Sequence, residues 1–341
     1  MNLLLIFMTV ETPCEQFKSV EFHTLYFNRR QATGQTVKAR LEDRFEVPTI
    51  RYDAKRVQGR ANMGREIETE PGPPDRHWLS IGRHTPDNPV VLEATDCVAV
   101  EAPLEIRLHG RPAAVLMRTP GNDRELVTGF LFCEGVISHP GQIISIDPVD
   151  DALAAMDGQV VDVRLDSPSR GRGIERFFYS TSSCGACGKR SIDSLEVRHQ
   201  QQTTNLRVSM AVLQQALDIS RSRQSLFVAT GGSHASALFK PGGEPCFLRE
   251  DVGRHNALDK AIGASLLAGL IPLDSHILAI SGRVGYEIIQ KASTAGIPVI
   301  VAVGAPTTLA VNLAVEHGIT LAGFARQGAM NIYSHSERIE P

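Results

Sequence analysis

The sequence predicts an α/β protein, with a layered domain over residues 201–341 and a smaller α+β domain over residues 90–200. In the second half, short apolar strands alternate with amphipathic helical segments across short Gly/Pro loops, which is typical of βα units around a largely parallel sheet. In the first half, strands with alternating polarity precede a single helix. The change from one pattern to the other places the domain boundary near residue 200.

Residues 1–89 are expected to form a poorly ordered extension. The run from Arg51 to Pro74 is polar and lacks apolar periodicity, and Glu70 to Pro74 (EPGPP) breaks regular structure. Met1 to Val10 is apolar like the core of a signal peptide, but it lacks a basic start and a cleavage site. We therefore expect order to begin near Val90.

A β-hairpin opens the domain expected over residues 90–200. Leu104 to Leu108 alternates with polar residues, and Ala113 to Arg118 returns as the second strand. The next helix is predicted to start at Asn122 as N-cap, with Glu125 completing a capping box, and Cys133 is expected in its core face. Further strands are expected at 143–146 and 160–165.

The domain expected over residues 201–341 starts with a helix from Met210, capped by Ser209. The following elements are predicted in order: strand 226–230, hairpin 235–239 with 245–250, helix 256–267, strand 277–281, helix 286–295, strand 299–303, helix 308–316 and strand 319–324. Asp259 and Lys260 are expected as charges on a helix surface.

Four loops at the strand ends suit a phosphorylated ligand. Ligands of parallel sheets bind beyond the carboxyl ends of the strands. Gly, Ser/Thr and Arg recur there, and they offer free backbone amides and guanidinium groups to anions. The loops are Thr230–His234, Ser281–Arg283, Gly304–Thr307 and Phe324–Gly328.

Composition restricts the function classes. The net charge of -3 argues against a general electrostatic grip on nucleic acid or anionic lipid. No stretch approaches the ~18 consecutive apolar residues of a membrane span. The 6 cysteines of the 341 residues are too dispersed for a secreted disulfide framework. We expect a soluble protein of a reducing cytoplasm, without nucleic acid or membrane as partner.

The segment with the clearest chemistry holds Cys184 and Cys187. Only Gly185 and Ala186 separate the two cysteines, and Lys189 and Arg190 follow them. Nearby positive charge favours the thiolate form of a cysteine, and a thiolate on a flexible loop can attack a sulfur donor and leave with a persulfide. The pair is therefore predicted to carry sulfur.

Three alternatives for the pair stay open: half of a zinc site completed by His234 or His255, a thioredoxin-like redox pair, and an inert structural pair. Hydrolytic deamination is disfavoured. Zinc nucleobase deaminases need His-x-Glu and Pro-Cys-x-x-Cys. Here Ala257 stands two positions after His255, and Ser183 precedes Cys184.

Several motifs resemble one known family. The most specific is Glu250 to Lys260 (EDVGRHNALDK), supported by Ser183–Gly188, Thr230–His234, Glu101–Arg107, Met117–Gly121, Gly129–Gly135 and the tail from Ser281 to Tyr333. They resemble the formate dehydrogenase accessory sulfurtransferases, the FdhD family, over about residues 90 to 340. No resemblance covers the first ~85 residues.

The resemblance implies a sulfur carrier. Such a protein takes persulfide sulfur from a cysteine desulfurase on the residue that corresponds to Cys184, with Cys187 as second thiol. It delivers the sulfur to the molybdenum (or tungsten) bis(molybdopterin guanine dinucleotide) cofactor before that cofactor enters formate dehydrogenase. The resemblance also implies a homodimer and a cytidine-deaminase-like three-layer α/β/α sandwich as second domain. We predict no permanent metal.

The expected cofactor-binding residues come from two sources. The family's binding stretch corresponds to Phe324, Ala325, Arg326, Gln327, Gly328 and Ala329, where Ala329 stands in place of an expected larger or more polar residue. Arg254 and His255 open a helix and Arg283 follows a strand, so the three are predicted to meet anionic groups. Alternatively, Asp251 or Asn256 caps that helix, and Arg283 forms a surface salt bridge.

A second function from another class also stays open. The chain can be a chaperone that binds the molybdopterin nucleotide, with a structural or zinc-bound cysteine pair. A carrier gains one sulfur on Cys184, whereas zinc-bound thiolates resist modification.

Overall fold

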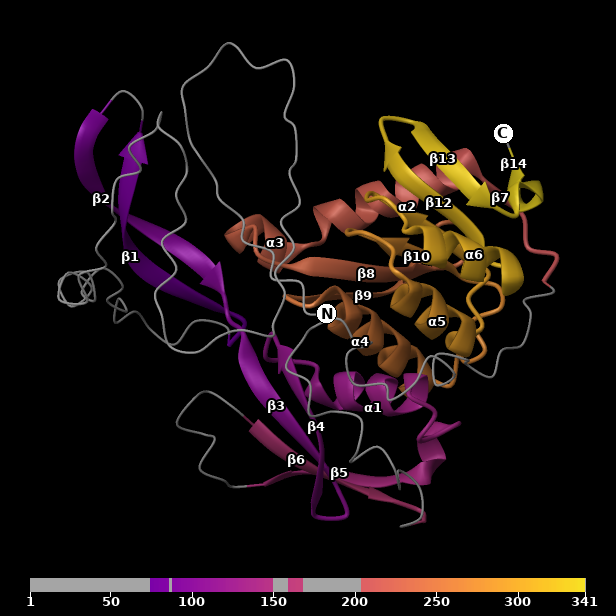
Figure 1. Ribbon diagram of the computed structural model, residues 1–341, viewed down its shortest axis with the longest axis horizontal. Coiled ribbons are helices and arrows are strands. Elements are labelled where there is room, and N and C mark those ends of the chain that lie inside the picture. Colours follow the sequence, from indigo (N-terminus) through magenta and orange to yellow (C-terminus); the bar gives the residue numbers. More distant parts are fainter. Residues whose placement is uncertain (1–73, 86–87, 150–158, 168–203, 341) are drawn as a thin grey trace, which may run out of the picture. The chain divides into compact units, whose positions relative to one another are not determined.

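The computed structural model describes residues 74–85, 88–149, 159–167 and 204–340 (Figure 1). Cys184 and Cys187 lie outside these residues. The first described elements are β1 (Arg76–Thr85) and β2 (Asn88–Ala99), which form an antiparallel ribbon. The extension predicted for residues 1–89 is thus wrong at its end, because β1 is held by backbone pairing with β2, which needs no apolar periodicity.

A four-stranded sheet follows, in the order β4-β3-β6-β5. Its strands are β3 (Ala102–Leu108), β4 (Arg111–Arg118), β5 (Ile143–Val149) and β6 (Gln159–Leu165). The predicted hairpin of β3 and β4 is confirmed. Leu104, Ile106 and Leu108 are buried in the core with helix α1 (Asp123–Cys133), where Cys133 is buried as predicted.

The predicted capping box at α1 is wrong. Asn122 adopts a left-handed conformation with φ 58° and makes no side-chain cap hydrogen bond. Both carboxylate oxygens of Glu125 instead accept hydrogen bonds from Arg249, which lies 124 positions later in the chain. The Glu125 side chain thus forms an ion pair with Arg249 instead of the local hydrogen bond that a capping box requires.

The larger sheet has six strands in the order β13-β12-β11-β10-β8-β9. They are β8 (His234–Phe239), β9 (Pro245–Asp251), β10 (Ile277–Ile280), β11 (Val299–Ala302), β12 (Thr320–Arg326) and β13 (Ala329–Ser334). Within the described chain, parallel pairing links β10 to β11 and β11 to β12, whereas the other three pairs are antiparallel. The sheet is therefore mixed rather than largely parallel, because β13 is added antiparallel at one end and the β8–β9 hairpin is added antiparallel at the other.

Helices pack on both faces of this sheet. On one face, α2 (Met210–Ser222) shares a core with Ala237, Phe239 and Val301. On the other, α4 (Arg254–Leu267), α5 (Tyr286–Ala295) and α6 (Thr308–Glu316) share a core with the opposite strand residues, such as Leu238 and Leu278. The predicted bounds of α5 and α6 are confirmed, and Ser209 caps α2 as predicted by accepting from the backbone of Val212.

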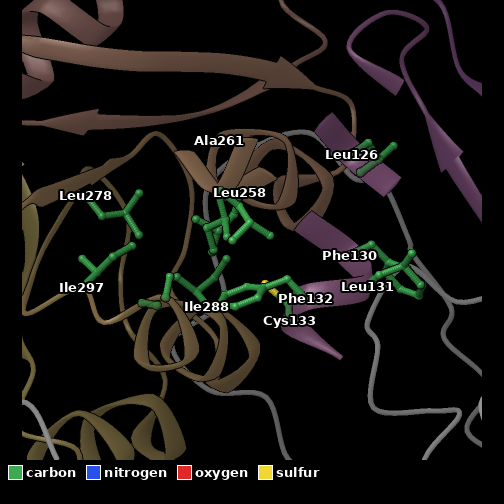
Figure 2. Close-up of a cluster of buried hydrophobic side chains, with 14 of the residues drawn as sticks. Leu126, Phe130, Leu131, Phe132, Cys133, Leu258, Ala261, Leu278, Ile288 and Ile297 are labelled. Carbon is green, nitrogen blue, oxygen red and sulfur yellow. The ribbon is translucent and has the colours of Figure 1, made fainter. Parts of the chain in front are cut away.

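The core that contains α4, α5 and α6 continues into the part of the chain before residue 200. Figure 2 shows Leu126, Phe130 and Cys133 of α1 in the same cluster as Leu258 of α4 and Ile288 of α5. The two parts on either side of residue 200 therefore share one hydrophobic core.

Two predictions about side chains and local structure are wrong. Residues Ser225–Thr230 form the short helix α3, not a strand. Asp259 and Lys260 are buried and not helix-surface charges. Their charges are compensated by Lys291 and Asp251, respectively. The smaller elements are η2 (Pro140–Gln142), β7 (Val208–Ser209), η7 (Ser336–Arg338) and β14 (Ile339–Glu340), of which β7 and β14 pair in parallel.

Candidate functional site

The four predicted loops meet at one edge of the six-stranded sheet. Thr230–His234 precedes β8, but β8 runs antiparallel to β10, so its first residues lie beside the carboxyl end of β10. A hydrogen bond joins the start of β8 to the end of β10, since Ser281 Oγ accepts from Ala235 N at 2.8 Å. On the other side, Phe324 N donates to Gly304 O at 3.2 Å.

Glycines allow these loops to approach closely. A Cβ on Gly304 would lie 2.6 Å from the carbonyl oxygen of Gly282. A Cβ on Gly282 would in turn lie 3.1 Å from Nδ1 of His234. The backbones of the Ser281–Arg283 and Gly304–Thr307 loops are thus in contact, with the His234 ring against the first of them.

Three helices begin at the same edge. Their N-caps are Gly253, Gly285 and Thr307, and they follow β9, β10 and β11. Gly253 and Gly285 provide no side-chain cap. Helix amino termini carry partial positive charge and unsatisfied N–H groups, so this edge favours anions.

Positive side chains reinforce this preference. Burial lowers the pKa of His234 below its ordinary value of 6.5, and the nearby charges of Arg254 and Arg283 lower it further. The two guanidinium groups therefore act on one imidazole. Arg254 Nε is buried and has no hydrogen-bond partner among the described residues. His255 Nε2 lies 3.8 Å from Glu287 Oε2.

Neither Asp251 nor Asn256 caps the start of α4. Asp251 accepts from Gly253 N at 2.8 Å but provides no cap, and Asn256 donates to Met117 O at 2.7 Å. No salt bridge involves Arg283 within the part of the chain that the structure describes, and its side chain is exposed. Among the described residues, no acidic side chain forms a salt bridge with Arg254 or Arg283.

An open pocket of about 340 Å³ borders this cationic edge. Its described lining consists of Arg221, Gln224, Phe227, Gly231 to Ser233, His234 and Ser281. The guanidinium carbon of Arg221 lies 4.6 Å from the centre of the Phe227 ring. Sequence reasoning missed Arg221, Gln224 and Phe227. Of these, Phe227 lies in the segment that was assigned a strand and forms α3, whereas Arg221 belongs to the end of α2 and Gln224 precedes α3.

Much of the Glu250–Lys260 motif holds the fold together. Lys260 Nζ lies 2.7 Å from Asp251 and donates to Thr119 O at 2.8 Å. Thr119 N donates to Asp251 at 3.1 Å. The motif therefore joins the start of α4 to the segment between β4 and α1, and its Arg254 lies near enough to His234 of the pocket to lower the pKa of that ring.

The predicted binding stretch Phe324–Ala329 spans the turn between β12 and β13. Phe324 and Gln327 have positive φ values of 53° and 52°, and Phe324 is 40% exposed. Ala325 is buried in the core beneath α2, so it can offer a ligand only its backbone. Gly328 N donates to Gln214 of α2 at 3.4 Å, which places the tip of the turn toward α2.

The described residues hold no group of three or more His, Cys, Asp or Glu side chains placed to bind a metal ion. In the same residues, no helix is both long and apolar enough to cross a membrane.

Comparisons with known proteins agree on one family. The model of the FdhD/NarQ family matches residues 99–340. The sulfur carrier protein FdhD of Streptomyces avermitilis is 46% identical over 254 residues, covering 72% of this chain and 89% of the relative. That of Saccharolobus solfataricus is 45% identical over 249 residues, with 72% and 91% covered.

A solved structure shares the fold. The crystal structure of a "putative formate dehydrogenase accessory protein" from Desulfotalea psychrophila has a TM-score of 0.62 and 24% sequence identity. The match covers 78% of this chain and 100% of that chain. At this identity the likeness concerns the mixed α/β fold.

Proposed function

Because the chain belongs to the FdhD/NarQ family, we propose that it is a sulfur carrier that serves formate dehydrogenase. It accepts persulfide sulfur from a cysteine desulfurase on Cys184. It passes this sulfur to the molybdenum (or tungsten) bis(molybdopterin guanine dinucleotide) cofactor, which is its substrate. It is thus a sulfurtransferase of the cytoplasm.

The sulfur chemistry belongs to Cys184 and Cys187. The Cys184 thiolate attacks the outer sulfur of the desulfurase persulfide, the S–S bond of that persulfide breaks, and the desulfurase thiolate leaves. Once the cofactor is bound, attack of the Cys187 thiolate on Cys184 Sγ releases hydrosulfide to the cofactor and leaves a Cys184–Cys187 disulfide, which a dithiol reductant must reduce before the next cycle. Lys189 and Arg190 support the first step because positive charge favours the thiolate.

One observation carries the nucleotide part of the proposal: Arg254 Nε is buried without a described partner at an edge that also holds Arg283 and two uncapped helix amino termini. A pyrophosphate satisfies such groups. Arg254, His255, Arg283 and the stretch Phe324–Ala329 are the proposed contacts, and the neighbouring pocket is wide enough to accept part of a nucleotide.

Finer features of the architecture are proposed with this function. Helices on both faces of a mixed sheet support a three-layer α/β/α sandwich of cytidine-deaminase type over residues 201–341. Residues 90–200 then form the smaller α+β domain, with the cysteine pair at its end. A homodimer is the proposed assembly.

The sulfur step is tested by mass spectrometry after incubation with a cysteine desulfurase and cysteine. We expect a reducible adduct of about 32 Da, one sulfur, on wild-type protein and on Cys187→Ala, and none on Cys184→Ala. If no form carries the adduct and each binds one zinc ion, the carrier proposal fails and a cofactor-binding chaperone with zinc-bound cysteines is the better account.

The nucleotide part is tested separately with GDP as probe. Arg254→Gln and Arg283→Gln should each weaken GDP binding by about tenfold, because each removes a charged hydrogen-bond donor. Arg164→Gln is the matched control, since Arg164 is exposed on β6 of the other sheet. Equal affinity of all three variants would refute the assignment of this edge.

A further inference from the structure

One wall of the pocket is a single continuous segment of the chain. It runs from Gln224 through α3 and the two glycines that follow it, Gly231 and Gly232, to His234. It supplies all the described lining residues except Arg221 and Ser281. Helix α3 has six residues, and Gln224 at its N-cap makes no side-chain hydrogen bond to it. So short a helix needs external partners for its first N–H groups.

Glu250 of β9 supplies these partners. Its Oε2 accepts from Leu226 N at 2.9 Å, and its Oε1 accepts from Phe227 N at 2.8 Å. The same Oε1 accepts from Ser233 Oγ at 2.7 Å. One carboxylate thus holds the segment at both ends, at the start of α3 and just before His234.

The chemistry of these bonds requires a carboxylate. An ionised carboxylate is an acceptor at both oxygens, whereas a glutamine amide accepts at one and presents N–H donors at the other. In Glu250→Gln, either orientation of the amide would turn its N–H group toward a backbone N–H, that of Leu226 or that of Phe227. The segment would lose an anchor even though side-chain size is unchanged.

We infer that Glu250 is a positioning residue, which sets the place of the pocket wall from Phe227 to His234 and thereby the affinity for the nucleotide substrate. This inference rests on the proposed function. Glu250 is not among the described residues that line the pocket, so it acts through Phe227, Ser233 and His234. Sulfur uptake on Cys184 does not depend on it.

The test compares full-length wild type with Glu250→Gln and Ser233→Ala. Glu244→Gln is the matched control, because Glu244 is an exposed residue in the turn of the same β8–β9 hairpin. Three quantities are measured: hydrogen exchange of the amides from Leu226 to His234, GDP affinity, and persulfide loading of Cys184 by a desulfurase.

We expect faster exchange in this segment and about tenfold weaker GDP binding for Glu250→Gln, the size of a lost hydrogen bond to a charged group. Ser233→Ala keeps both bonds to α3 and should weaken binding about threefold, by the loss of one hydroxyl bond. Both variants should load sulfur like wild type, which separates positioning from general unfolding.

Other results overturn the inference in distinguishable ways. If wild type binds GDP and Glu250→Gln binds it equally well, the positioning role is wrong and the proposed function stands. If Glu250→Gln fails to fold, Ser233→Ala decides: unchanged exchange and affinity in that variant overturn the role. If wild type does not bind GDP at all, the nucleotide part of the proposed function fails and the positioning role fails with it.

Discussion

At the scale of single residues, His234 is an imidazole whose protonation is disfavoured by burial and by two neighbouring arginines. Burial, followed by the charges of Arg254 and Arg283, lowers its pKa below the ordinary 6.5, while Asp251 acts in the opposite direction. Between 6.5 and this lowered value, the unfolded chain binds more protons at His234 than the folded protein does. His234 therefore makes the folded protein less stable as the pH falls through that window.

We predict that His234→Asn reduces the loss of unfolding free energy between pH 7 and pH 5, as measured by urea titration at each pH. Because the charges of Arg254 and Arg283 are partly screened by salt, the difference from wild type should shrink at high ionic strength. His276→Asn is the control: burial lowers the pKa of His276 as well, but without those two arginines. A His234→Asn profile that parallels wild type would contradict this account.

At the scale of elements, the crossing of α1 and α4 depends on two glycines. A Cβ on Gly129 of α1 would overlap the backbone carbonyl of Asp259, and a Cβ on Gly263 of α4 would overlap the carbonyl of Glu125. The obstacles are backbone atoms, which cannot rotate away. The two helices are therefore as close as their backbones allow.

Gly129→Ala and Gly263→Ala should each destabilise the protein by about 1–3 kcal/mol, the usual cost of overpacking, although alanine is the better helix former. Thermal and urea unfolding measure the effect. In the control Gly141→Ala, the new Cβ meets the His139 side chain at 3.3 Å, which can move. An unchanged unfolding midpoint for both helix variants would show that the helices separate at little cost.

At the scale of the whole molecule, a buried ion pair joins the two parts of the chain. Asp251 and Lys260 are both buried, and both bond to the backbone of Thr119 in the segment between β4 and α1. The hydrophobic cluster of α1 with α4 and α5 crosses the same junction (Figure 2). We expect the parts before and after residue 200 to unfold together.

Lys260→Met should cost about 3–5 kcal/mol, because it leaves the Asp251 carboxylate buried without its cation. The loss should appear in a single transition, followed by circular dichroism and by calorimetry. Lys240→Met is the control, since Lys240 is exposed at the β8–β9 turn and surface changes usually stay within about 0.5 kcal/mol. Two separate transitions in the variant would show that the parts fold independently.

Much of the architecture could be predicted from the sequence because its signals are local. The apolar periodicity of α5 and α6, the glycines that bound α5, the β8–β9 hairpin and the Ser209 cap all involve residues that are near one another in the chain. The sequence also placed Arg254 at a helix start and Arg283 after a strand, and in the structure both lie near enough to His234 to lower its pKa.

By itself, then, the sequence determined the family, the order of most helices and strands, and the cysteine pair proposed to carry sulfur. Only the tertiary structure decided that residues 225–230 are helical, that Glu125 leaves its helix cap, and that Asp259 and Lys260 are buried. In each case a deciding partner is distant in the chain: Glu250 for α3, Arg249 for Glu125, Lys291 for Asp259 and Thr119 for Lys260. Ion pairs and hydrogen bonds of this kind outweigh local propensity, and no local pattern records them.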